Sequence, residues 1–65
     1  MKILLNGNPY ETNSSTVSEI LGELALDDAV VATAINGQFV AKVARSATCL
    51  EAGDAIEVLA PMQGG

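Results

Sequence analysis

The sequence has no histidine, a single cysteine (Cys49) and few aromatic or basic residues. Without histidine there can be no imidazole acid–base site, and one thiol forms neither an internal disulfide nor a four-ligand zinc site. With 3 basic against 8 acidic residues, the formal net charge of −5 disfavours a surface that neutralises phosphates on nucleic acid or anionic lipid. These absences argue against an enzyme, and they predict no nucleic-acid and no membrane partner.

Long apolar runs are also missing. No run approaches the ~20 residues of a membrane-spanning helix, and the N-terminus lacks the basic start and cleavage site of a secretory signal. We therefore expect a soluble, cytoplasmic protein. Its 65 residues suffice for one domain, and an apolar share of 49% is what so short a chain needs to build a core without disulfides.

The first half of the chain predicts a hairpin. Residues 1–6 alternate so that Ile3 and Leu5 share one face of an extended strand. The Asn-Gly-Asn-Pro segment that follows, 6–9, predicts a tight reversal into a second short strand over 10–12.

A helix is predicted to begin at Val17. Thr16 and Glu19 have the spacing of a capping box, in which side chains satisfy the first unpaired amides of a helix. Four apolar residues then recur at helical spacing: Val17, Ile20, Leu21 and Leu24. The adjacent acids 27–28 end the segment; without a histidine or a third ligand they indicate a solvated loop rather than a metal site.

The second half returns to strand patterns. Residues 30–35 are rich in branched side chains, and Asn-Gly at 36–37 predicts a hairpin into a strand at 38–41. Residues 42–49 are compatible with a short helical turn, and 55–60 alternate as a final strand.

This order of elements predicts an α+β domain, in which one helix packs on one face of a mixed sheet of four to five strands. The first and last strands can pair in parallel, because the helix supplies the crossover between them. We expect the domain to cover residues 1–60. Residues 61–65, after a strand-ending proline and with two terminal glycines, are expected to form a flexible tail.

Several stretches together match a known family: the opening strand 1–6, the helix start 16–21, the segment 32–37 that ends in Ala-Ile-Asn-Gly, the segment 53–59 that begins with Gly-Asp, and Gly64-Gly65. On these residues the whole chain resembles the ubiquitin-like sulfur-carrier proteins of thiamine biosynthesis, the ThiS-like family. The resemblance implies a β-grasp fold and a carrier with no bound cofactor.

The resemblance also implies the chemistry of the tail. An activating enzyme would use ATP to adenylate the Gly65 carboxylate, a sulfur donor such as a cysteine desulfurase system would convert it to a thiocarboxylate, and a thiazole synthase would accept the sulfur. The residues suit this chemistry independently. A free carboxylate is a poor electrophile until it is activated, and Gly64 and Gly65 lack the Cβ that would obstruct a narrow, water-excluding channel.

The partner enzymes are expected to dock on the sheet face opposite the helix, with Leu4, Leu59 and Met62 as candidate contacts. For Leu4 and Leu59 singly, ordinary core packing is the stronger expectation, whereas Met62 lies beyond the last strand and suits an adaptable interface. Cys49, with only Arg45 nearby to lower its pKa, is interpreted as a small buried or inert residue rather than a persulfide carrier.

Three other functions remain compatible with the sequence. The sulfur carriers of molybdenum-cofactor synthesis share the fold and the Gly-Gly end, although the short chain favours thiamine. A noncovalent β-grasp binding module would make the terminal glycines incidental. Conjugation of Gly65 to lysines, as a protein tag, would need the same activation.

Overall fold

The computed structural model describes residues 1–60. The predicted tail, with Met62, Gly64 and Gly65, lies outside the described residues. Within these residues seven elements follow one another: β1 (Lys2–Leu5), β2 (Asn8–Glu11), α1 (Val17–Glu23), β3 (Ala32–Ile35), β4 (Gln38–Val40), the 3₁₀ helix η1 (Lys42–Ala47) and β5 (Ala55–Leu59). No helix among residues 1–60 is long and apolar enough to cross a membrane.

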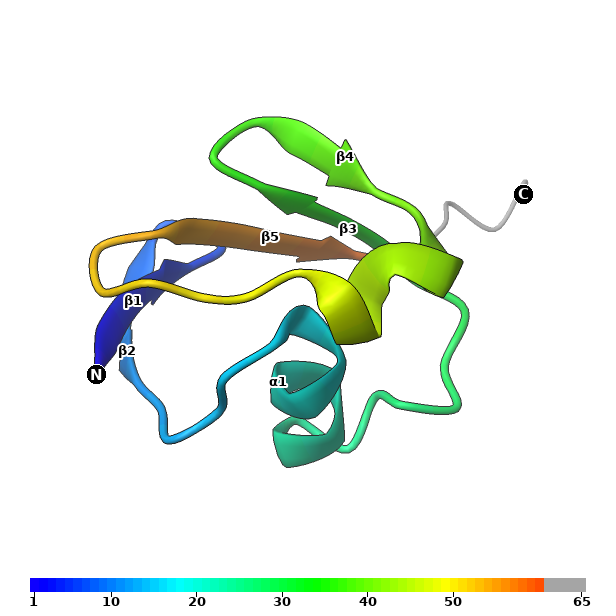
Figure 1. Ribbon diagram of the computed structural model, residues 1–65, viewed down its shortest axis with the longest axis horizontal. Helices are drawn as coiled ribbons and strands as arrows, with labels where there is room; N and C mark the ends of the chain where they lie inside the picture. The colour runs from blue at the N-terminus through cyan, green and yellow to red at the C-terminus, as the bar shows by residue number, and fades with distance from the viewer. Residues whose placement is uncertain (61–65) are drawn as a thin grey trace.

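The five strands form one mixed sheet in the order β2-β1-β5-β3-β4. The last strand, β5, lies at the centre, parallel to β1 and antiparallel to β3. Figure 1 shows α1 below this sheet, with the β1–β2 hairpin to its left and η1 above it and to its right. The predicted α+β class, the single main helix and the parallel pairing of the first and last strands are all confirmed.

Both hairpins turn through Asn-Gly, as predicted. Asn6 and Gly7 have φ of 50° and 84°, and Asn36 and Gly37 have φ of 49° and 83°. Two consecutive positive φ angles define the turn type that matches the twist of paired strands, and asparagine and glycine adopt them most readily. The local sequence therefore determines both reversals.

Two strands begin two residues away from the predicted start. The second strand covers Asn8–Glu11 rather than 10–12, since Pro9 lies opposite Leu4 on an edge strand, where a missing N–H can be tolerated. The third strand begins at Ala32 rather than 30, because Val30 is exposed and the Val31 carbonyl accepts a hydrogen bond from a side chain outside the sheet.

The helix begins where the capping box predicts. The Thr16 hydroxyl accepts a hydrogen bond from the Glu19 amide at 3.1 Å, and the Glu19 carboxylate accepts one from the Ser15 amide at 2.6 Å. The buried side of α1 then packs on the inner face of β1 and β5. The buried cluster consists of Ile3, Val17, Ile20, Leu21, Leu50, Ile56 and Val58.

Arg45 is the main structural feature that the sequence did not predict. It is buried, its Nε donates to the Thr33 hydroxyl at 3.1 Å, and its Nη2 donates to the Val31 carbonyl at 2.7 Å. A buried guanidinium needs such partners. These bonds fasten η1 to β3 and explain why the polar 42–49 segment is ordered.

Candidate functional site

The face of the sheet that lies away from α1 carries exposed apolar side chains; we call it the outer face. Leu4 on β1 and Leu59 on β5 are 40% and 56% exposed, while their neighbours Ile3 and Val58 are buried. The expectation that Leu4 and Leu59 pack in the core is therefore wrong for both. Strand alternation directs them to the outer face, where the docking hypothesis needs them.

Phe39 on β4 is a further exposed apolar residue of this face, and sequence reasoning missed it. Its side chain is 73% exposed. Phe39 pairs with Ala34 of β3, and Ala34 pairs in turn with Glu57 of β5. The next residue, Val40, is buried, so strand alternation directs Phe39 to the outer face. Because both residues are apolar, the sequence carried no signal of which one points outward.

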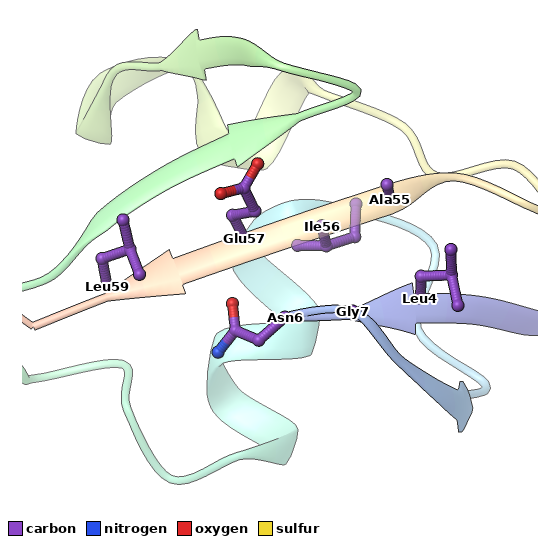
Figure 2. A pocket seen from close by; sticks show the side chains of 7 residues that line it. All are labelled: Leu4, Asn6, Gly7, Ala55, Ile56, Glu57 and Leu59. Carbon is purple, nitrogen blue, oxygen red and sulfur yellow. The ribbon is translucent and has the colours of Figure 1, made fainter.

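A shallow hollow of about 530 Å³ runs along β1 and β5 on this face. Figure 2 shows its lining side chains, with Leu4 on one strand and Glu57 and Leu59 on the other. The complete lining consists of Leu4, Asn6, Gly7, Ala55, Ile56, Glu57 and Leu59. The hollow follows the strand that leads to the C-terminal residues.

Asn6 holds β5 in place beside this hollow. Its side-chain amide donates to the Val58 carbonyl at 3.1 Å, and its side-chain oxygen accepts from the Val58 amide at 2.8 Å. Because β1 ends at Leu5, these two bonds continue the pairing of β1 with β5 by means of a side chain. The position of the last strand near its end thus depends on Asn6, which the sequence identified only as a turn residue.

Asn36 likewise holds β5 in place through its side chain, at the start of the strand. Its side-chain oxygen accepts from the Ala55 amide at 3.0 Å, and its side-chain nitrogen donates to the Asp54 carboxylate at 3.0 Å. Both Asn-Gly turns therefore bind the central strand, one at each end.

A polar cluster around Glu23 closes the end of α1 against the loop after β2. The Glu23 carboxylate accepts hydrogen bonds from the hydroxyls of Tyr10 at 2.5 Å, Thr12 at 2.7 Å and Ser14 at 2.9 Å. The bonds from Tyr10, Thr12 and Ser14 lower the pKa of Glu23, and the bond to Glu23 raises the pKa of Tyr10. The cluster has a structural explanation, since a carboxylate at a helix C-terminus needs donors to offset the helix dipole.

Cys49 is exposed, so the structure excludes burial, the first of the two alternatives given for it, and an inert thiol remains the prediction. It forms an isolated bridge with Thr16, and the next residue, Leu50, is buried instead. Alternation along this extended segment directs Leu50 inward and Cys49 outward.

The sheet order and the single α-helix that crosses the sheet within residues 1–60 define a β-grasp, ubiquitin-like domain. Comparison with known proteins gives the family. The ThiS family matches residues 3–65, and the chain belongs to it. Members of this family are sulfur carriers of thiamine biosynthesis and not enzymes.

Two solved structures support the assignment. The crystal structure of the thiamine biosynthesis protein ThiS from Geobacter metallireducens has 33% identity and a TM-score of 0.86, with 100% of each chain covered. A solution structure of a thiamine biosynthesis protein from the same organism has 32% identity and a TM-score of 0.80, and covers 100% of this chain and 88% of that one. No curated protein matches significantly.

Proposed function

We propose that this chain carries sulfur on the carboxylate of Gly65 for formation of the thiazole moiety of thiamine. The observation that carries the proposal is that the family match extends through the terminal Gly64-Gly65. The thiamine pathway is favoured over molybdenum-cofactor synthesis, because the family and both similar structures are named for thiamine biosynthesis.

The proposed chemistry has two steps, adenylation of the carboxylate and transfer of sulfur to it. The Gly65 carboxylate attacks the α-phosphorus of ATP on an activating enzyme, which forms an acyl adenylate and releases pyrophosphate. A hydrosulfide equivalent then attacks the acyl carbon; a C–S bond forms, the C–O bond to AMP breaks, and a thiocarboxylate results. If a cysteine desulfurase system delivers the sulfur as a persulfide, the terminal persulfide sulfur attacks the acyl carbon and displaces AMP, which leaves an acyl disulfide. A second thiol then attacks the donor's sulfur; the S–S bond to the acyl sulfur breaks, a new disulfide forms, and the thiocarboxylate is released.

The domain itself serves as the recognition surface for the activating enzyme and the thiazole synthase. Leu4, Phe39 and Leu59 expose apolar area on one face, which is the composition of a docking surface rather than of an idle sheet. Gly65 follows Leu59 by six residues, a reach of at most about 20 Å. A partner that covers Leu59 must therefore hold its reactive centre within that distance, and Met62 would contact the same partner.

The proposal is tested by intact mass after incubation with the activating enzyme, ATP and a sulfur source. We expect a gain equal to the exchange of one oxygen for one sulfur. Because the activation consumes ATP, we expect it to occur in the cytoplasm. A covalent adduct to lysines of other proteins would instead identify a protein tag.

Variants of the tail separate its chemistry from the fold. Deletion of Gly64 and Gly65 should abolish ATP–pyrophosphate exchange while the free energy of unfolding stays within ~0.5 kcal/mol of the parent. An added residue after Gly65 should abolish exchange as well, and Gly65→Ala should reduce exchange more than docking. Full exchange by the deletion variant would exclude the carrier mechanism, and undiminished partner binding without any activation would favour a noncovalent binding module.

A further inference from the structure

One carboxylate lies within the apolar outer face. Glu57 is exposed at the middle of β5, and strand alternation puts Ala55 and Leu59 beside it on the same face. Across the sheet it pairs with Ala34, whose own partner is Phe39. Glu57 lines the hollow, and Figure 2 shows its carboxylate on the side of β5 that faces β3. Apart from Asn6, which lines the same hollow, these neighbours are small or apolar.

Three other acidic side chains accept hydrogen bonds within the fold, and Glu11 lies 4.0 Å from the N-terminal amine. Glu23 accepts bonds from three hydroxyls, Glu19 caps α1, and Asp54 accepts from Asn36 and from the Glu51 amide. Within residues 1–60, Glu57 has neither a hydrogen bond nor an ion pair from its carboxylate. Asp27, Asp28 and Glu51 also lack such partners within residues 1–60, but they lie outside the strands, whereas Glu57 lies in β5 on the outer face. Its position on this face suggests that its partner lies outside the domain.

Docking would change the surroundings of this charge. A partner that covers Leu4 and Leu59 removes water from the hollow, and a carboxylate that loses its water without gaining a counter-charge is strongly unfavourable. A partner with an apolar surface alone would therefore be rejected, whereas one with a correctly placed cation would be selected. The net charge of −5 attracts the same kind of partner at long range.

We propose that Glu57 is the specificity-determining charge of the outer face, and that the activating enzyme presents an arginine or lysine side chain, ringed by apolar residues, to it. The inference rests on the proposed function and adds the chemistry of the partner surface. A guanidinium suits the site best, because it pairs with both carboxylate oxygens while its flat faces contact apolar side chains.

The test compares Glu57→Gln with Glu51→Gln, which removes the same charge from an exposed turn residue. Calorimetry without ATP measures the Kd of each variant for the activating enzyme, and ATP–pyrophosphate exchange gives KM for the carrier and kcat. We expect Glu57→Gln to raise Kd and KM by about 10-fold or more, to leave kcat within about twofold, and to flatten the salt dependence of Kd. Glu51→Gln should leave Kd unchanged, and Glu57→Asp should recover part of the affinity.

The outcomes separate the two proposals. Equal Kd values for the parent and Glu57→Gln, with the parent adenylated, would overturn the role of Glu57 and leave the carrier mechanism standing. A parent that binds through Glu57 but is never adenylated would overturn the carrier mechanism alone. A parent that does not bind the activating enzyme would overturn both. Melting curves check the fold of each variant, and we expect no shift for Glu57→Gln, because its carboxylate makes no bond within residues 1–60.

Discussion

The two faces of the sheet are formed by the same strands but differ in burial and in function. On the inner face Ile3, Ile56 and Val58 are buried against α1, and within residues 1–60 every buried side-chain nitrogen and oxygen has a hydrogen-bond partner. On the outer face Leu4 and Leu59 remain exposed. The inner face stabilises the fold, and the outer face keeps apolar area and one charge available for a partner.

The largest expected effect on stability is at Ile20, a buried residue of α1, and it is compared with Leu59 of the outer face. Ile20→Ala should lower the free energy of unfolding by ~2–5 kcal/mol, since the side chain is fully buried between α1 and the sheet. Leu59→Ala, which also shortens an aliphatic side chain, should change it by less than ~0.5 kcal/mol and should weaken binding of the activating enzyme instead. Urea unfolding and calorimetry measure the two quantities. A similar stability loss in both variants would remove the distinction between the faces.

A smaller loss of stability is expected at Asn6, whose side chain continues the pairing of β1 with β5. Asn6→Asp keeps a residue type that tolerates positive φ but removes the donor to the Val58 carbonyl, so we expect a loss of ~1–3 kcal/mol. Asn8→Asp, with the same charge change at an exposed neighbour, should stay within ~0.5 kcal/mol. Equal urea midpoints for the two variants would show that Asn6 acts only as a turn residue.

Variants of the helix cap test how much the local hydrogen bonds at the start of α1 contribute to the free energy of unfolding. Thr16→Ala removes the acceptor for the Glu19 amide and should lower the free energy of unfolding by ~1 kcal/mol. Thr16→Ser retains the hydroxyl and serves as the control. If thermal unfolding of Thr16→Ala matches the parent, packing alone determines where α1 begins.

The smallest effect concerns pH. The folded pKa of Glu23 lies below its ordinary value, so the Glu23 cluster stabilises the fold fully at neutral pH and loses this contribution as the pH falls through the lowered pKa. At the alkaline end the raised pKa of Tyr10 means that the contribution persists below pH 10.0 and fades as the pH rises through the raised value.

Comparison of the parent with Glu23→Gln isolates this contribution from the other carboxylates. The parent should unfold at a higher urea concentration than the variant at pH 7, and the difference should shrink as the pH is lowered below about 4. A difference that stays constant over this range would indicate that the bonds of Glu23 do not depend on its charge.

Prediction from the sequence succeeded where short-range patterns decide the structure. Alternation assigned Ile3 to one face, the capping box located the start of α1, and two Asn-Gly pairs located both reversals. Prediction failed where a residue's surroundings come from distant parts of the chain. Leu4 and Leu59 were expected in the core, because whether a second layer covers a strand face is not a local property.

The same reason explains the site residues that were missed. Arg45 is buried because the fold brings Thr33 and the Val31 carbonyl to it, and Cys49 is exposed because its segment pairs with Thr16. Their neighbours in sequence carry no sign of either contact. Phe39 and Glu57 come to share one face only through the pairing of β4, β3 and β5.

The sequence by itself determined the order of elements, the turns, the amphipathic helix and the resemblance of the Gly-Gly end to a carrier tail, since each depends on residues a few positions apart. Only the tertiary structure decided that β5 lies between β1 and β3, and hence that Leu4, Glu57 and Leu59 line one hollow. The physical reason is that strand pairing joins residues far apart in the chain, and an alternating strand has two faces whose local pattern does not say which one the helix will cover.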